Sequence, residues 1–135
     1  MTKRPICRLL GATGLAMLAI GCSGDAAPSP SALAQPGEAN VVLSSATGTE
    51  GALLLAITGP VTRVLPVGYE TASRSTSTGA SIVLRGDIAS GVVVRVQVPD
   101  LRNLGEYSVR VDAASDRQTY QELPVGSYTA ILVKR

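Results

Sequence analysis

The sequence contains no histidine, no phenylalanine and no tryptophan, and it has two cysteines, Cys7 and Cys22. Without histidine, a Ser-His-Asp or Cys-His catalytic arrangement and a histidine metal ligand are excluded. Any aromatic platform has to be built from the four tyrosines. We therefore expect no catalytic residue, no metal site and no cofactor in this chain.

The sequence also lacks an apolar run long enough to span a bilayer. Residues 9–20 carry no charge and follow the basic residues Lys3, Arg4 and Arg8. A helix of this length covers roughly 18 Å, whereas the hydrocarbon core of a bilayer is about 30 Å thick. A basic start followed by a short apolar centre is typical of a secretion signal. We assign residues 1–21 to such a signal.

The apolar run ends in Ala-Ile-Gly-Cys at residues 19–22, which resembles the lipobox of bacterial lipoproteins. The resemblance implies that Cys22 is lipidated, as by palmitate, and becomes the mature N-terminus, so that acyl chains anchor the protein to a membrane. Ser23 resembles the residues that permit sorting to the outer membrane in a cell with two membranes. An ordinary secretory signal, cleaved after Gly21 or Gly24, is the alternative.

Positive charge is scarce outside the signal. Three of the 12 Lys and Arg residues lie in the leader, which leaves nine against ten Asp and Glu. The nine are scattered, apart from the pair Lys134-Arg135. A nucleic-acid-binding surface needs a net positive face, so we expect no nucleic acid partner. Once Cys7 leaves with the leader, no disulfide can form within the chain, and its stability has to come from its core.

The remaining sequence divides into a linker and a β-rich domain. Residues 22–40 are rich in Ala, Ser, Pro and Gly, which is typical of a flexible linker. From 41 to 135, short aliphatic runs alternate with turn residues at intervals of roughly 8 to 12 residues, which predicts an all-β antiparallel sandwich of about seven or eight strands. We expect strands at 41–45, 52–58, 61–66, 81–86, 92–98, 106–113 and 127–133, and a weaker one at 117–121. We expect a helical turn at 101–104 and a solvated loop at the Ser- and Thr-rich residues 71–81.

Alternation indicates which faces are buried. Within residues 92–98 the valines at even positions share one face, whereas Arg95 and Gln97 share the other. Leu53, Leu54 and Leu55 instead make their strand apolar on both faces. We expect this to be a central strand that is covered on both sides, or one whose outer face is an interface.

Residues 103–109, Asn-Leu-Gly-Glu-Tyr-Ser-Val, resemble the Asp-x-Gly-x-Tyr-x-Cys segment of immunoglobulin-like domains. The resemblance implies that the hydroxyl of Tyr107 bonds back to the backbone at the corner that enters a late strand, so that Tyr107 is structural. The overall strand pattern also resembles cohesin and carbohydrate-binding sandwiches of secreted bacterial proteins.

Carboxylates are the remaining candidates for chemistry, because glycosidases need two at a defined separation. The sequence offers Glu50, Glu70, Asp87, Asp100, Glu106, Asp112, Asp116 and Glu122. Most of them lie at turns or outward strand positions, and we interpret each as solvated surface. Asp112 and Asp116 flank a turn and could join a calcium site through oxygen ligands, but their spacing matches no EF-type loop. Residues 85–87 spell Arg-Gly-Asp, which we interpret as a strand-ending arginine followed by a turn.

The sequence thus predicts an extracytoplasmic protein of the cell envelope that is anchored through Cys22 and acts as a non-catalytic binding or structural module. Its expected partners are the membrane and an envelope protein or glycan. One alternative is a carbohydrate-binding module, which would show two exposed tyrosines side by side. Another is a small hydrolase, which would show two carboxylates in a cleft. A flat apolar patch around residues 52–58 would favour a protein partner.

Overall fold

The computed structural model describes residues 33–44 and 47–135, and residues 34–135 form one compact unit. The predicted signal, Cys22 and most of the predicted linker lie outside the described residues. Within the described ranges, no helix combines the length and the apolar character needed to cross a membrane.

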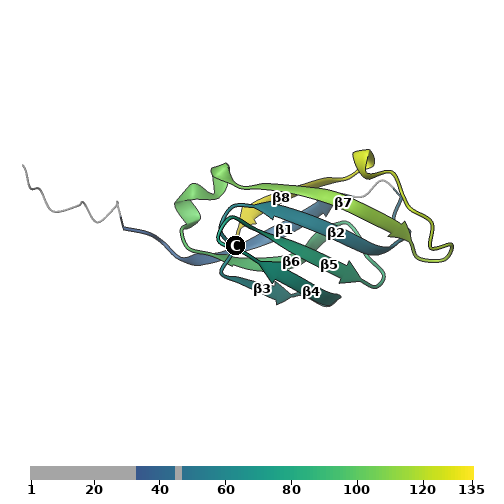
Figure 1. The fold of residues 1–135 in the computed structure, drawn as a ribbon, viewed down its shortest axis with the longest axis horizontal. Helices are drawn as coiled ribbons and strands as arrows, with labels where there is room; N and C mark the ends of the chain where they lie inside the picture. The colour runs from purple at the N-terminus through teal and green to yellow at the C-terminus, as the bar shows by residue number, and fades with distance from the viewer. Residues whose placement is uncertain (1–32, 45–46) are drawn as a thin grey trace, which may run out of the picture. The chain divides into compact units, whose positions relative to one another are not determined.

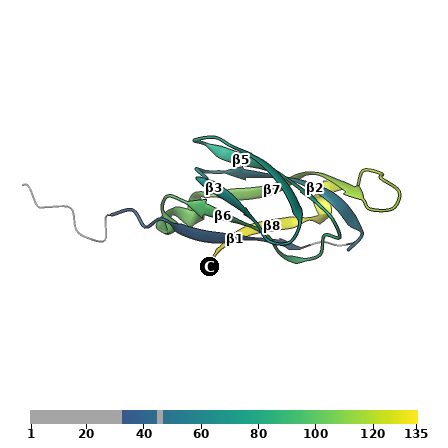
Figure 2. The ribbon, with the colours of Figure 1, turned by 90° about the horizontal axis from the view of Figure 1, so that it is seen from below.

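The compact unit is a sandwich of two four-stranded antiparallel sheets, as the sequence predicts. The first sheet has the order β3 (Arg63–Pro66), β6 (Gly91–Val98), β1 (Gly37–Ser44), β8 (Thr129–Lys134). The second has the order β4 (Glu70–Ser75), β5 (Gly79–Arg85), β2 (Glu50–Thr58), β7 (Ser108–Asp116) (Figure 1). Two short 3-10 helices, η3 (Leu101–Glu106) and η4 (Val125–Ser127), precede β7 and β8. Figure 2 shows β2 and β5 in one layer and β1, β6 and β8 in the other.

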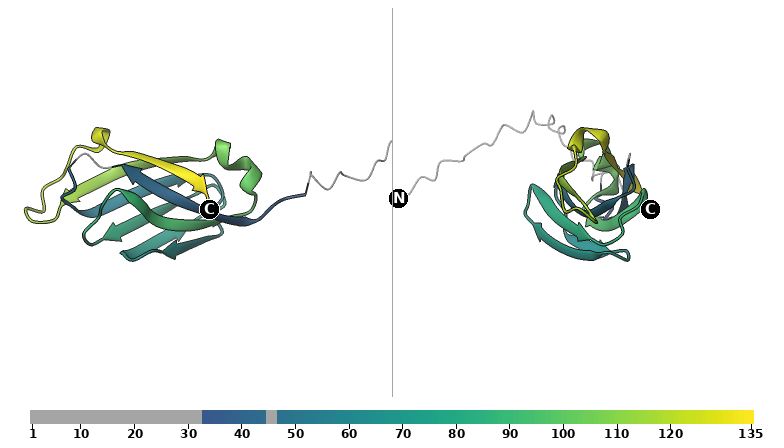
Figure 3. Two further views of the ribbon diagram at one scale, coloured as in Figure 1. Left: turned by 180° about the vertical axis from the view of Figure 1, so that it is seen from behind. Right: turned by 90° about the vertical axis from the view of Figure 1, so that its right-hand side faces the viewer.

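Most connections between strands pass from one sheet to the other. The exception among the described strands is the hairpin that joins β4 to β5. The strands β1 and β8 from opposite ends of the chain are neighbours, as Figure 3 shows from behind. In an immunoglobulin domain the first two strands lie in one sheet, whereas β1 and β2 lie in different sheets. The chain therefore shares the sandwich architecture with those domains but not this connection.

The core between the sheets is aliphatic, because alternate residues of each strand point inward. Leu53 and Leu55 of β2 and Ile82 and Leu84 of β5 are at most 1% exposed. Leu54, between Leu53 and Leu55, points to the outer face of the sheet and is half-buried. The buried set also includes Ala39, Val41, Leu43, Ile57, Val61, Ala80, Ile88, Val93, Val94, Val96, Val98, Val111, Ala114 and Ala130.

The predicted strands are largely confirmed. Those expected at 41–45, 52–58, 61–66, 81–86, 92–98, 106–113 and 127–133 are present as β1, β2, β3, β5, β6, β7 and β8, with shifted ends. The helical turn expected at 101–104 is η3. Strand β1 begins at Gly37, so the linker assigned to 22–40 overlaps the sheet.

Two element predictions are wrong. Residues 70–75 form β4, although 71–81 was expected to be a loop. Since β4 is an edge strand with mainly exposed residues, it shows no apolar alternation. Residues 117–121 form no strand, because the chain turns there after β7.

The valine alternation in β6 also needs a correction at its start. The pairing of β1 with β6 shifts register between Val41, which faces Val94, and Val42, which faces Val92. Val93 is the extra residue of this irregularity, and it is buried. Val92 therefore lies on the outer face, where 39% of it is exposed.

Candidate binding surface

An apolar row crosses the outer face of the second sheet. Ala72 of β4 pairs with Val83 of β5, Val83 pairs with Leu54 of β2, and Leu54 pairs with Ala113 of β7. Directly paired residues point to the same side of a sheet, so these four side chains line up across all four strands. We call this set, Ala72, Val83, Leu54 and Ala113, the apolar row.

Polar side chains border the apolar row on both sides. On one side, Glu70 pairs with Arg85, whose other neighbour across the sheet is Ala52. On the other side, Arg74 lies at the β4 edge and Arg110 at the β7 edge of the same face. An exposed apolar strip with a polar rim is the usual composition of a protein interaction site.

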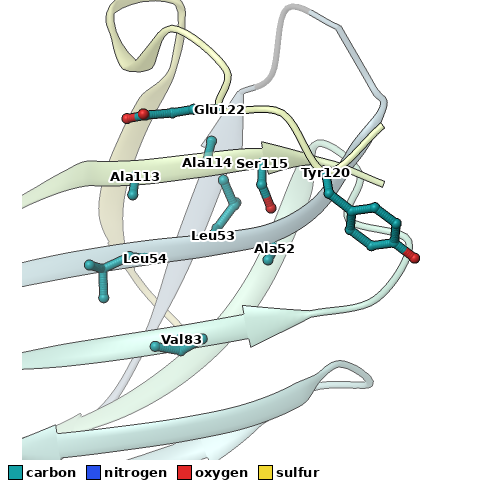
Figure 4. Close-up of a pocket in the computed structure, with 9 residues that line it drawn as sticks. All are labelled: Ala52, Leu53, Leu54, Val83, Ala113, Ala114, Ser115, Tyr120 and Glu122. Carbon is teal, nitrogen blue, oxygen red and sulfur yellow. The ribbon is translucent and has the colours of Figure 1, made fainter. Parts of the chain in front are cut away.

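A shallow hollow of about 260 Å³ lies over the β2–β7 half of the row (Figure 4). It is lined by Ala52, Leu53, Leu54, Val83, Ala113, Ala114, Ser115, Tyr120 and Glu122. Figure 4 shows Leu54 and Val83 on neighbouring strands, with the ring of Tyr120 projecting beyond the strand ends. The surface is therefore mostly aliphatic with one aromatic side chain at its end.

Tyr120 is held in place by the turn that follows β7. The carboxylate of Asp116 accepts hydrogen bonds from the backbone N–H groups of Gln118 and Thr119, at 2.7 and 2.8 Å. The backbone N–H of Tyr120 donates to the carbonyl of Asp116 at 3.1 Å. Tyr120 itself adopts φ 58°, and 84% of it is exposed. A non-glycine residue rarely adopts this conformation, so the turn bonds have to hold it there.

The turn bonds stabilise the ionised form of Asp116. The N–H groups of Thr119 and Gln118 lower the pKa of this carboxyl below its ordinary value, and the N–H of Thr119 has the larger effect. Since the pKa is lowered in the folded state, the stabilisation is present above the ordinary aspartate pKa of about 4 and is lost as pH falls through the folded pKa.

The difference in the free energy of unfolding between wild type and Asp116→Asn should therefore shrink as pH is lowered from about 6 to about 2. Urea unfolding at several pH values measures this difference. A difference that stays constant over the whole range would show that the charge of Asp116 does not support the turn.

The predicted Arg-Gly-Asp turn lies at the charged end of the same face. Arg85 ends β5 and lies 3.7 Å from Glu70, and Asp87 lies 2.8 Å from Arg117. These side chains border a second hollow of about 380 Å³ that shares Tyr120 with the first. Both charged members of the tripeptide thus take part in exposed ion pairs within the chain, which agrees with its interpretation as a turn.

Glu50 contradicts the expectation that the acidic residues are solvated surface. It is fully buried at the start of β2. Its Oε1 accepts hydrogen bonds from the hydroxyl of Thr47 and, at 2.9 Å, from that of Tyr128. Tyr128 lies 78 residues away along the chain, so no local pattern could have indicated this partner.

The expectation that Tyr107 is structural is supported by its contacts. Its hydroxyl donates a 2.6 Å hydrogen bond to the backbone carbonyl of Pro60, in the connection between β2 and β3. Burial raises the pKa of this hydroxyl. A Cβ on Gly59 would lie 2.5 Å from the ring, so a glycine is needed beneath it.

Two further acidic residues of the candidate set, Asp112 and Asp100, form ion pairs within the chain. Asp112 lies 2.5 Å from Arg110, and Asp100 caps η3 and forms a 2.7 Å ion pair with Arg102, which holds the pKa of Asp100 well below its usual range. Within the described ranges, no three or more Cys, Asp or Glu side chains gather as a metal site would require.

The outer face of the first sheet is apolar over a shorter distance. Ile131 of β8 pairs with Val42 of β1, which pairs with Val92 of β6. The neighbouring row mixes polar and apolar residues, since Asn40 lies between Val133 and Arg95. The uninterrupted four-strand row therefore makes the second sheet the better candidate.

The sequence points to this surface through Leu54, because three successive leucines predict a central strand with an apolar outer face. β2 is indeed a central strand. The sequence gives no sign of Tyr120 as part of the surface. No protein-family model, no curated protein sequence and no solved structure matches the chain.

Proposed function

We propose that this chain is an extracytoplasmic lipoprotein, anchored through Cys22, whose β-sandwich binds an envelope protein through the outer face of the β4-β5-β2-β7 sheet. The apolar row carries the proposal. Four aligned side chains on the four strands offer an aliphatic strip, and the charged residues beside it supply a rim that can fix the orientation of a partner.

A protein fits this surface better than a glycan does. Sugar-binding faces use aromatic rings, and of the four tyrosines only Tyr120 is exposed. The hydroxyl of Tyr69 accepts from the N–H of Ala89, and those of Tyr107 and Tyr128 bond to Pro60 and Glu50. The described residues thus offer no pair of exposed rings on which a sugar can stack.

A binding role also fits the carboxylates better than hydrolysis does. A general acid needs a carboxyl that keeps its proton near neutral pH. The pKa of Asp116, which lines the second hollow, is instead lowered by its turn. Glu70 and Asp87 beside it form ion pairs with arginines.

Photocrosslinking in the native cell tests the proposal. A photoreactive amino acid at Val83 should give an adduct with one protein, because this residue lies in the middle of the apolar row. Val92 is the matched control, since it is also a valine, is also 39% exposed and lies on the outer face of the other sheet.

Introducing Leu54→Asp into the Val83 probe chain should lower the yield of that adduct by about tenfold or more, because a charge would then be buried at the interface. Adducts at Val92 rather than at Val83 would move the site to the other sheet. A probe at Val83 that yields no protein adduct would contradict the proposed function.

A further inference from the structure

Strand β4 is an open sheet edge that has little of the usual protection. In the described part of the chain, its outer side pairs with no strand. Proteins protect such edges with short strands, charged side chains (lysine above all), proline or bulges. Of these features β4 has two charged residues, Glu70 and Arg74, which are of opposite sign. β3 is four residues long and ends in Pro66, β8 ends in Lys134, and the pairing of β7 has register shifts. The pairing of β4 with β5 runs over six residues without a shift, and β4 contains neither proline nor lysine.

The register of the β4–β5 hairpin shows which backbone groups of β4 point to the open edge of the sheet. The N–H of Thr76 donates to the carbonyl of Gly79 at 2.7 Å, and hydrogen-bonded pairs alternate along an antiparallel ladder. Ala72 therefore exchanges hydrogen bonds with Val83, on the inner side of the ladder. The N–H and carbonyl groups of Thr71 and Ser73 point to the open edge.

We infer that β4 pairs with β4 of a second copy of this chain, antiparallel and about a two-fold axis at Ala72. In this register Thr71 of each copy faces Ser73 of the other. The N–H and carbonyl groups of these residues at the open edge then form four backbone hydrogen bonds. Ala72 faces Ala72 at a non-hydrogen-bonded position, where side chains are closest and a small residue fits.

Charge selects this register. Glu70 of each copy faces Arg74 of the other, on the outer face of the sheet, which gives two opposite-charge pairs. A shift of the register by two residues places either Glu70 or Arg74 opposite Ala72 of the other copy instead. A shift by four brings two like charges together. The strand is thus complementary to itself in one register, as a two-fold interface requires.

Pairing would also join the two apolar rows end to end. Ala72 is the last member of the row at this edge, and the two-fold axis places it beside Ala72 of the second copy. The outcome is one eight-stranded sheet with a continuous apolar strip across its outer face. The pairing itself rests on β4 alone and does not depend on the proposed function.

Disulfide trapping of the full chain under mild oxidation tests this pairing. Ala72→Cys should give a disulfide-linked dimer of twice the chain mass. Ala113→Cys is the matched control, because it lies in the same row at the opposite edge of the sheet, and it should give none. Wild type shows any background from Cys7 and Cys22. Equal yields from Ala72→Cys and Ala113→Cys, or no dimer at all, would overturn the inference.

The charges provide a second test. Glu70→Arg in the Ala72→Cys chain should lower the dimer yield by about tenfold, since two arginines then face each other at both ends of the pairing. The double change Glu70→Arg/Arg74→Glu should restore it, because the complementarity is only inverted. Sedimentation in mild detergent of the same chains without Ala72→Cys should show less dimer for Glu70→Arg than for the wild type and the double change. A double change that stays as low as Glu70→Arg would refute the register.

Discussion

Replacement of Leu55 by alanine should lower the free energy of unfolding by about 2 to 5 kcal/mol. Leu55 is 0% exposed in the middle of β2, where it pairs with Ile82 on one side and Val111 on the other. The loss combines the transfer of the removed groups with the cavity that remains. Small domains are stable by only about 5 to 15 kcal/mol, so this change removes a large part of the total. Urea unfolding followed by circular dichroism measures it.

Leu54→Ala is the matched control, because the residue type and the strand are the same and the side chain points outward. We expect it to cost less than about 1 kcal/mol, since surface substitutions have small effects. It should nevertheless weaken the photoadduct at Val83, which lies beside it. Equal losses of stability from Leu54→Ala and Leu55→Ala would contradict the assignment of one face to the core and the other to a partner.

Replacement of Cys22 by alanine should abolish the incorporation of labelled fatty acid. The expectation rests on the resemblance of residues 19–22 to a lipobox, because Cys22 lies outside the described residues. Since a single acyl chain binds a membrane only marginally, stable anchoring needs the several chains that a lipoprotein cysteine carries. Metabolic labelling followed by immunoprecipitation measures the incorporation.

Cys7→Ala provides the control for this experiment. Cys7 belongs to the predicted signal, so its loss should leave the label unchanged. Label that remains in Cys22→Ala, or that disappears in Cys7→Ala, would be incompatible with lipidation at Cys22. An unlabelled wild-type chain would favour the ordinary secretory signal.

The sandwich could be predicted from sequence because most of its strands bury one face. The alternation around Val96 and Val111 directly reflects that burial. Strand β4 could not be found in this way, since its pairing consists of backbone hydrogen bonds between β5 and a segment rich in Ser and Thr. The sequence also could not show that Val92 lies on the outer face. The register shift that places it there arises from the pairing of β6 with β1.

The candidate surface could be predicted only in its centre. Leu54 stands out because it lies between two other leucines in a strand. The alignment of Val83 and Ala113 with it depends on register, which is set by contacts between distant segments. Tyr120 belongs to the surface because the Asp116 turn places it there with a positive φ, and a polar turn sequence does not reveal this.

The position of β1 between β6 and β8 governs when this domain can fold. The first strand of the sandwich needs the last one as a neighbour, and most other strands also pair with partners distant in the sequence. Topologies of this kind fold slowly, on a scale of about milliseconds to seconds. A chain that emerges from a membrane with its N-terminus first exposes β1 long before β8. If the chain is exported as proposed, completion of the domain has to wait until β8 has crossed the membrane, and until then the aliphatic strands depend on the surrounding compartment for protection against aggregation.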